Sequence, residues 1–242
     1  KDTNDATTYS VEVPDYNIKH KIQNSKLTVG IPKEYFGEGL NDDVRKSLQD
    51  IIEICKSKGC EVKNVSIPST PYALAAYYIL VPAEISSNRA RYDGVRFGKK
   101  INENYEENMV QTRTQYFEDE VKRRIMIGTY SLSAGYSEQF YKQASKVRTK
   151  LKREFDKAFE EVDVLLAPVT PCTAFRLGEK SSDPVQMYLV DIYTVTANLV
   201  NVPAFAIPAG KDSDGMPIGV QFMAPKFQEK KLFEAAEMIN LN

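Results

Sequence analysis

Short apolar runs alternate with longer helical stripes along most of this chain. The segment 26–32 (KLTVGIP) predicts a strand, and 60–68 (CEVKNVSIP) alternates as a second strand does. A helical stripe lies between them, formed by Val44, Leu48, Ile51, Ile52 and Cys55. Asn41 and Asp42 offer a cap for this helix, Asp43 suits its first turn and Gly59 can end it. A strand, a helix and a strand in this order predict a βαβ unit with parallel strands.

The middle of the chain is predicted to be largely helical. Residues 70–98 begin with Thr-Pro, continue in an alanine-rich body and end in Asp93-Gly94, while 100–120 is polar and either helical or loose. Residues 137–160 give the clearest helix, with Ser137 as its cap. One apolar stripe runs along it, formed by Phe140, Ala144, Val147, Leu151, Phe155 and Phe159.

The last third of the chain predicts three strands and a closing helix. The run 162–168 (VDVLLAP) suits a strand buried on both faces. The segments 202–210 and 218–225 predict a hairpin, with Asp214-Gly215 in its turn, and 228–240 predicts a helix. We therefore expect an α/β fold: a mixed β-sheet flanked by helices, parallel at the start and antiparallel at the end. Residues 1–25 form a polar lead-in to a domain over 26–242.

Composition removes several classes of function. The chain has 242 residues, of which 42% are hydrophobic, and a net charge of -1, which disfavours a strongly basic nucleic-acid binder. No apolar run is long enough for a membrane span, and no secretory leader is evident. Cys55, Cys60 and Cys172 form no CxxC pair, which suits a reducing cytosol and argues against a disulfide framework or zinc site. A Cys172–His20 catalytic pair is less expected than a buried thiol, because His20 lies in a polar stretch.

The usual catalytic motifs are missing from the sequence. It contains no GxSxG elbow, no phosphate-binding GxxxxGK[ST], no GxGxxG and no HExxH. Prolines interrupt two apolar strands, in APVTPC (167–172) and NVPAFAIPAG (201–210). Such prolines are common where strands end at the rim of a pocket, but simple strand termination is the favoured explanation from composition alone.

Six blocks in order carry a resemblance to a known family. They are KLTVGIPKEYFGEG, YYILVPAEISSNRARYDGVRFG, EVKRRIMIGTYSLSAGY, FDKAFEEVDVLLAPVTPCTAF, DPVQMYLVDIYTVTANLVNVPAFAIPAG and DGMPIGVQFMAP. Together, over roughly residues 26–240, they resemble the C-terminal half of amidase-signature proteins. Within that family they are most similar to the A subunits of the glutamyl-tRNA(Gln)/aspartyl-tRNA(Asn) amidotransferases.

The resemblance implies a mechanism whose reacting groups lie elsewhere. Enzymes of this family use a serine nucleophile, a second serine joined by a cis peptide, and a lysine, all in a Gly/Ser-rich core. Nothing in this chain matches that core, so we expect no catalytic residue here and no activity of the chain alone.

The resemblance also implies a substrate-binding role for three residues. The donor would be glutamine, held by its α-carboxylate and α-ammonium. Arg124, the second arginine of VKRRI, matches the carboxylate clamp, which a guanidinium can form bidentately. Asp191 matches the contact to the ammonium, and Tyr77, the first tyrosine of YYIL, matches a pocket-lining contact. The alternatives are a solvated cation for Arg124, a helix cap or local ion pair for Asp191, and core packing for Tyr77.

Partners and cofactors are implied in the same way. The family assembles as a heterotrimer, so we expect partner amidotransferase subunits. A partner would bind most of the tRNA, together with ATP and Mg²⁺, and no cofactor is expected on this chain. We also expect a cytoplasmic location without membrane contact. The cations on the 137–160 helix could suggest RNA, but acidic residues follow at once, so a solvated face is the better reading. The cations are Lys142, Lys146, Arg148, Lys150, Lys152 and Arg153.

Two other functions stay open at this point. A stand-alone amidase for small amides would need neither Arg124 nor Asp191, because such a donor lacks amino-acid charges. A non-catalytic scaffold for partner subunits would show no glutaminase activity.

Overall fold

The computed structural model describes residues 1–14, 26–37, 39–179 and 184–239. Contacts divide the chain into two compact units. Unit 1 comprises Lys1–Val65, Ala158–Ala174 and Val202–Asn242, and unit 2 comprises Ser66–Lys157 and Phe175–Asn201. Each unit is therefore built from segments that lie far apart in sequence. The boundary between a lead-in and a domain at residue 25 stays a prediction, because residues 15–25 are outside the described part.

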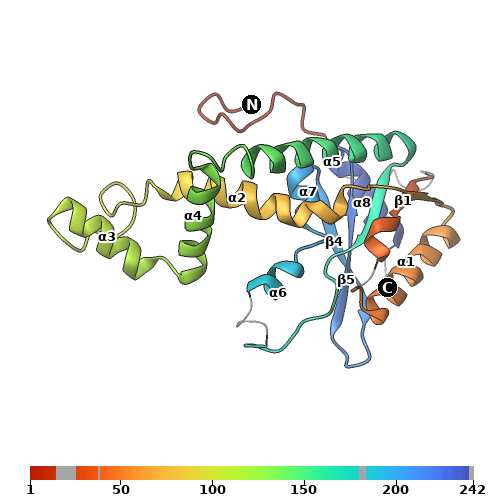
Figure 1. The fold of residues 1–242 in the computed structure, drawn as a ribbon. Coiled ribbons are helices and arrows are strands. Elements are labelled where there is room, and N and C mark those ends of the chain that lie inside the picture. The colour runs from red at the N-terminus through yellow and green to blue at the C-terminus, as the bar shows by residue number, and fades with distance from the viewer. Residues whose placement is uncertain (15–25, 38, 180–183, 240–242) are drawn as a thin grey trace. The chain divides into compact units, whose positions relative to one another are not determined.

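Unit 1 contains one mixed five-stranded sheet in the order β2-β1-β3-β5-β4 (Figure 1). The strands are β1 (Thr28–Pro32), β2 (Glu61–Val65), β3 (Val164–Pro168), β4 (Ala204–Lys211) and β5 (Pro217–Met223). β1 pairs in parallel with β2 and β3, whereas β5 pairs antiparallel with β3 and β4. The predicted α/β class, the parallel βαβ start and the antiparallel hairpin are all confirmed.

Two helices of unit 1 pack against this sheet. These are α1 (Asp42–Ser57) and α8 (Glu229–Ile239), which contact β3, β4 and β5 as well as each other. The predicted cap of α1 is confirmed, because the Asn41 side chain accepts a hydrogen bond from the Asp43 amide at 2.8 Å. The central strand β3 is fully buried along its length, as its apolar run predicts. A short 3₁₀ helix, η1 (Lys33–Phe36), follows β1 and buries Tyr35.

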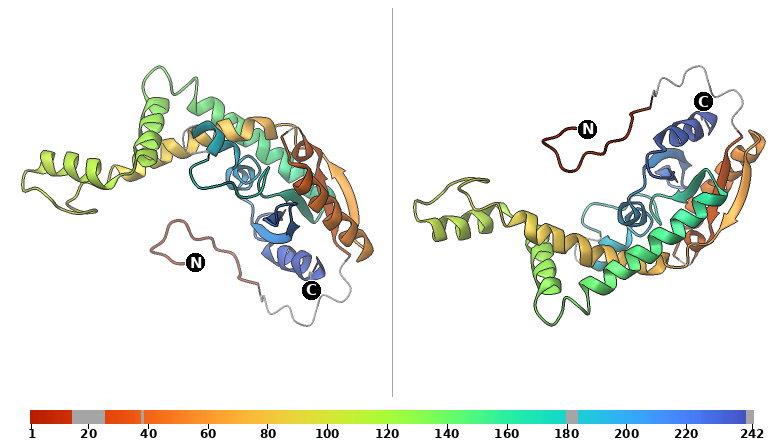
Figure 2. Two further views of the ribbon diagram at one scale, coloured as in Figure 1. Left: turned by 90° about the horizontal axis from the view of Figure 1, so that it is seen from below. Right: turned by 90° about the horizontal axis from the view of Figure 1, so that it is seen from above.

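Unit 2 is helical. It contains the 3₁₀ helix η2 (Thr70–Tyr72), α2 (Ala73–Arg89), α3 (Tyr105–Tyr116), α4 (Asp119–Leu132), α6 (Pro184–Leu189), α7 (Val195–Val200) and all but the last turn of α5 (Tyr141–Glu161). α2 packs against both α4 and α7. Figure 2 gives two further views of these helices. The apolar stripe of α5 is confirmed in its centre, where Leu151 and Phe155 are fully buried.

One predicted boundary is wrong. Ser137 does not cap α5, which begins four residues later at Tyr141. The amides of Tyr136 and Ser137 both bond to the Ser133 carbonyl, and Gly135 adopts a φ of 88°, so the chain turns here. Aromatic packing draws Phe140 into this turn, with its ring centroid 5.9 Å from that of Tyr130. The aromatic contact with Tyr130 of α4 therefore outweighed the local capping signal.

Candidate functional site

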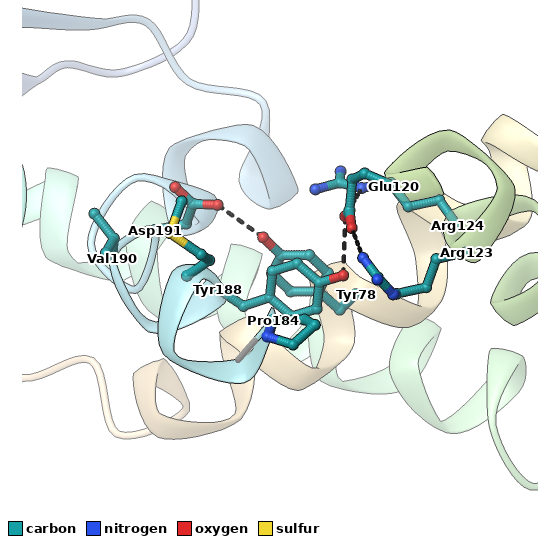
Figure 3. Close-up of a pocket in the computed structure, with 9 residues that line it drawn as sticks. Tyr78, Glu120, Arg123, Arg124, Pro184, Tyr188, Val190 and Asp191 are labelled. Carbon is teal, nitrogen blue, oxygen red and sulfur yellow. Dashed lines mark hydrogen bonds and ion pairs between the residues drawn. The ribbon is translucent and has the colours of Figure 1, made fainter. Parts of the chain in front are cut away.

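A cavity of about 400 Å³ in unit 2 holds two of the three site residues predicted from the sequence, together with further charged and aromatic groups. Three elements surround it: α2, α4, and the stretch from α6 to the turn that follows it (Figure 3). The cavity is lined by Tyr78, Glu120, Arg123, Arg124, Pro184, Met187, Tyr188, Val190 and Asp191.

The crossing of α2 and α4 sets the register of this cavity. Gly128 of α4 is buried directly against α2: a Cβ there would overlap the Pro82 carbonyl and lie 2.9 Å from the Ala83 nitrogen. Arg124 lies one turn before Gly128, and Tyr78 lies one turn before Pro82. Because residues four apart share a helix face, the close crossing brings the Arg124 and Tyr78 side chains together.

A stacked pair of tyrosine rings forms the floor of the arrangement. The rings of Tyr78 and Tyr188 have centroids 4.0 Å apart and an interplanar angle of 24°. The Arg124 guanidinium carbon lies 5.3 Å from the Tyr78 centroid and 5.8 Å from that of Tyr188. Both distances fall within the range of a cation–π interaction, which suits the flat guanidinium better than an ammonium.

Glu120 connects α4 to the ring pair. Its Oε1 accepts a hydrogen bond from Arg124 Nε at 2.8 Å and from the Tyr188 hydroxyl at 2.9 Å, and its Oε2 pairs with Arg123. Burial alone would raise the pKa of Glu120. The hydrogen bonds from Arg124, Tyr188 and Arg123 outweigh burial and hold the pKa below its ordinary value. Glu120 is therefore an anion at neutral pH and fixes the orientation of Arg124.

Asp191 lies on the other side of the rings from Arg124, as Figure 3 shows. Its Oδ2 accepts a hydrogen bond from the Tyr78 hydroxyl at 2.7 Å. Burial, followed by the bond to Asp191 and the charge of Asp191, raises the pKa of Tyr78 well above its usual value. Tyr78 therefore stays a neutral donor at all physiological pH values, and it holds the Asp191 carboxylate in place.

The structure brings two of the three predicted site residues into one cavity. Arg124 and Asp191 line it together, which sets aside the solvated cation for Arg124, whose side chain is 24% exposed. Tyr77 lies elsewhere: it lines a separate cavity of about 140 Å³ with Glu84 and Arg148, and its ring meets that of Tyr78 edge-on at 5.2 Å. Whether these residues bind glutamine stays a prediction.

Three residues that form the hydrogen bonds and the ring stack of the cavity were missed by the sequence reasoning. Glu120 carries a usable signal, because a glutamate four residues before an arginine forms a favourable helical pair. Tyr78 and Tyr77 are adjacent tyrosines, and they differ only in which of them lies on the face of α2 that contacts α4. The sequence does not show which face this is. Tyr188 has no sequence signal, because its position depends on how a short helix folds back onto α2.

The cavity offers charge recognition rather than chemistry of its own. Its lining carries two guanidiniums, two carboxylates and two tyrosine hydroxyls, and neither a serine nor a cysteine is among the residues that line it. Burial raises the pKa of Cys55 to about 12, so this thiol is protonated at neutral pH. His20 lies outside the described residues, so its pairing with Cys172 is untested. No cluster of three metal-ligating side chains occurs among the described residues.

Comparisons with known proteins agree with the motifs. The amidase family model matches residues 1–233. The A subunit of the glutamyl-tRNA(Gln) amidotransferase of Syntrophus aciditrophicus is 44% identical over 243 residues, covering 100% of this chain and 50% of the relative. The corresponding A subunit of Thermoanaerobacter pseudethanolicus is 45% identical over 238 residues, covering 97% of this chain and 48% of the relative. The chain thus spans about half the length of these curated relatives.

Solved structures share the fold. The crystal structure of the A subunit of the glutamyl-tRNA(Gln) amidotransferase from Thermotoga maritima superposes with a TM-score of 0.76 at 33% identity, covering 100% of this chain and 48% of that one. The allophanate hydrolase of Kluyveromyces lactis has a TM-score of 0.69 at 22% identity, covering 96% of this chain and 34% of that one, which shows likeness of fold alone. Across the described residues, no helix combines the length and the apolar character that crossing a membrane requires. The family model spans nearly the whole chain, and the chain therefore belongs to the amidase family.

Proposed function

We propose that this chain forms the substrate-holding half of the glutamine-hydrolysing subunit of a tRNA-dependent amidotransferase. The observation that carries the proposal is the placement of Arg124 and Asp191 in one cavity, on opposite sides of the stacked rings of Tyr78 and Tyr188. Free glutamine carries one negative and one positive group on its α-carbon. The cavity carries groups of both signs, with Asp191 on one side of the rings and Arg124 on the other, so it is complementary to such a zwitterion.

Arg124 is suited to the α-carboxylate. Its hydrogen bond to Glu120 uses Nε, and no hydrogen bond from its two terminal nitrogens to another described residue is found. Those two nitrogens can therefore take a carboxylate in the bidentate geometry that a lysine cannot provide. The ring contacts and Glu120 hold the guanidinium in one orientation before substrate binds, which lowers the entropic cost of binding.

Asp191 is suited to the α-ammonium. Tyr78 donates to one carboxylate oxygen, Oδ2, at 2.7 Å, which leaves lone pairs on both oxygens for further donors. A substrate ammonium can donate three hydrogen bonds, so it can bind Asp191 without displacing Tyr78. With both α-groups held in this way, the side-chain amide of glutamine is the free end of the molecule.

The relatives support the reaction that would follow. Several bear the name of the A subunit of a glutamyl-tRNA(Gln) amidotransferase, and this chain matches about half of their length. We propose that the serine–serine–lysine set expected for the family is supplied by the portion of the longer protein that this chain does not match. The serine hydroxyl would attack the glutamine amide carbon and release ammonia, and water would hydrolyse the glutamyl ester to glutamate.

The same names, which designate one subunit of a larger enzyme, underlie the rest of the proposal. The protein would act with partner amidotransferase subunits in the cytoplasm. A partner would bind tRNA, ATP and Mg²⁺ and would use the ammonia to convert Glu-tRNA(Gln) to Gln-tRNA(Gln). No ATP or metal site is proposed on this chain.

The test compares two substrates in the assembled enzyme that contains this chain. Arg124→Lys and Asp191→Asn should each raise KM for glutamine and leave hydrolysis of a small neutral amide nearly unchanged, because the neutral amide has no α-charges. Equal losses on both substrates would show that these residues support the fold or the serine machinery. Unchanged kinetics on glutamine would refute the proposed role of the cavity.

A further inference from the structure

The turn between α2 and α3 is built from buried polar groups although it lies at the surface. Asp93 is 4% exposed, and its Oδ1 accepts hydrogen bonds from the Val95 amide at 2.9 Å and the Arg96 amide at 3.0 Å. The Gly94 amide bonds to the Phe97 carbonyl at 2.8 Å, which closes the turn. Buried carboxylates are rare unless their bonding is satisfied, so this turn has a defined backbone conformation.

Helix α3 forms the platform that holds this turn. Asn108, 1% exposed, donates to the Asp93 carbonyl at 3.2 Å and accepts from the amides of Ile101 and Asn102 at 2.7 and 3.0 Å. Thr112 donates to the Lys99 carbonyl at 2.6 Å. These bonds tie both sides of the turn to one helix face. Within unit 2, α3 and the turn extend beyond the end of α2, away from α5, α6 and α7 (Figures 1 and 2).

Gly94 fits this platform closely. Its φ is +77°, and a Cβ at this position would lie 2.5 Å from Asn108 Nδ2 and 2.7 Å from Thr112 Oγ1. A larger residue would therefore strain the backbone and push the turn off α3. The conformation of the turn is thus determined by its contacts with α3 rather than by the side chains at its tip.

The tip of the turn presents its side chains to solvent. Val95 is 60% exposed, Phe97 is 49% exposed, and the Arg96 side chain is 74% exposed. Two apolar residues and an arginine thus stand partly exposed between two glycines, with the Phe97 ring 5.9 Å from that of Tyr92 and Arg96 paired with Asp93. Exposure of valine and phenylalanine side chains to water is unfavourable, so their burial by a partner would be favourable. Aromatic and arginine side chains are also enriched at the centre of protein interfaces.

Cations outnumber anions in the sequence segment that contains this tip. Between residues 89 and 100 the chain carries five cations and a single anion, the buried Asp93, whereas the whole chain has a net charge of -1. Two of these cations have carboxylate partners, Arg96 with Asp93 and Lys100 with Glu103. The cations are Arg89, Arg91, Arg96, Lys99 and Lys100. Arg89 and Arg91 also line a groove of about 390 Å³ beside the C-terminal end of α2.

We infer that Val95, Arg96 and Phe97 form a docking tip for a protein partner that offers an apolar recess rimmed by carboxylates. The apolar centre and the cationic rim give the tip the composition of an interface, and the rim complements an acidic partner. The pre-ordered backbone would lower the entropic cost of association. This inference goes beyond the substrate cavity, because it assigns a surface for assembly. It rests on the proposed function only for the choice of partner.

The test uses the full-length protein and the other subunits of its amidotransferase as the probe, with Kd measured at low and high salt. Phe97→Ser should weaken binding at least tenfold at both salt concentrations. Arg96→Glu should weaken it at least tenfold at low salt and less at high salt, since the rim is screened. Gly94→Ala should also weaken binding, although it keeps every side chain of the tip. Tyr72→Ser and Arg153→Glu are matched controls on exposed positions of unit 2 and should change Kd less than twofold.

Each outcome decides the inference. Wild-type Kd values for both Phe97→Ser and Arg96→Glu would overturn it, as would failure of the wild-type protein to bind those subunits. A loss of tRNA affinity with unchanged binding of the other subunits would assign the tip to RNA and reject the protein partner. If the tip variants lose binding but the wild-type assembly does not hydrolyse glutamine, the proposed function fails and the docking tip stands.

Discussion

At the scale of single residues, the cavity depends on how Arg124 is held. Glu120 binds one edge of the guanidinium, and the rings of Tyr78 and Tyr188 lie within cation–π distance of its carbon. Arg123 is the neighbouring cation in the same sequence run, yet its side chain is 42% exposed and its described ion pair is with Glu120. Both arginines line the cavity and bond to Glu120, but the Arg124 side chain is 24% exposed and the Arg123 side chain 42% exposed. This difference makes Arg123 a matched control for Arg124.

Arg124→Lys keeps the charge and removes the bidentate fork. If Arg124 binds the α-carboxylate, the contact should weaken by roughly 1.5–3 kcal/mol, which raises KM for glutamine about ten- to a hundredfold. Steady-state kinetics with glutamine and a neutral amide measure the effect. Arg123→Lys is the control and should change KM by less than about twofold, as expected for an exposed pair. A larger effect at Arg123 would transfer the clamp to that residue.

Tyr78→Phe removes the hydroxyl that holds Asp191 and keeps the stacked ring. We expect KM for glutamine to rise roughly fivefold, the order of one hydrogen bond, with little change in kcat. Because the pKa of Tyr78 is raised above its usual value, the wild-type KM should not respond to Tyr78 titration between about pH 7 and 9. Tyr77→Phe is the control from the adjacent cavity. If only Tyr77→Phe raises KM, the sequence-based prediction for Tyr77 is correct and Tyr78 has no binding role.

At the scale of elements, helix crossings and helix–strand ties position the side chains. The crossing of α2 and α4 requires Gly128, because no Cβ fits against the Pro82 carbonyl.

In unit 1, Asp163 connects three elements just before β3. It accepts hydrogen bonds from the Thr28 amide at 2.9 Å, near the start of β1, and from Lys231 of α8 at 2.7 Å.

Gly128→Ala should separate α2 from α4. Overpacking of this kind costs typically about 1–3 kcal/mol, so the free energy of unfolding should fall by that amount. KM for glutamine should rise at the same time, because Arg124 moves relative to Tyr78. Urea unfolding and steady-state kinetics measure the two effects. Gly37→Ala is the control, since a Cβ there has only the Glu34 carbonyl oxygen within reach, at 3.7 Å. Equal stability of both variants would show that the crossing is not tight.

Asp163→Asn should destabilise the protein by about 1–2 kcal/mol at pH 7. Burial alone would raise the pKa of Asp163, but the bonds from Lys231 and the Thr28 amide outweigh it and lower the pKa below 3.8. The folded state therefore binds fewer protons than the unfolded state, and this stabilisation is present above about pH 4 and lost as pH falls through the folded pKa.

The difference in unfolding free energy between wild type and Asp163→Asn should accordingly begin to shrink below about pH 4 and disappear as the pH falls past the lowered pKa of Asp163. Asp156→Asn, which removes an exposed partner of Lys152 on α5, should cost less than about 0.5 kcal/mol at either pH. A constant difference between wild type and Asp163→Asn across the pH range would mean that packing, and not charge, explains the loss.

At the scale of the whole molecule, binding and chemistry are expected to be separate. The cavity that holds Arg124 and Asp191 is lined by no serine, and the sequence contains no block that resembles the serine–serine–lysine core. The 242 residues by themselves should therefore release no ammonia from glutamine above the buffer blank. Turnover that disappears when a serine of this chain is mutated would contradict this prediction and place the nucleophile here.

Periodicity predicted most of the secondary structure correctly because each element is stabilised by its own pattern of burial. The buried run at 162–168 became β3, and Asp214-Gly215 became the turn between β4 and β5. The capped helix after Asn41 became α1. The predicted start of α5 was wrong because Phe140 packs on Tyr130 of the preceding helix, and no capping signal in the sequence encodes this contact.

The candidate site divides in the same way. The sequence alone, through motif resemblance, determined the amidase family and singled out Arg124 and Asp191. These residues could be found in this way because charged side chains are identified by residue type alone. Only the tertiary structure decided that these two share a cavity, that Tyr78 rather than Tyr77 joins them, and that Glu120 and Tyr188 complete it. The physical reason is that the cavity depends on packing between segments that are far apart in sequence. Tyr78 and Asp191, for example, are separated by 113 residues, and no local pattern encodes their contact.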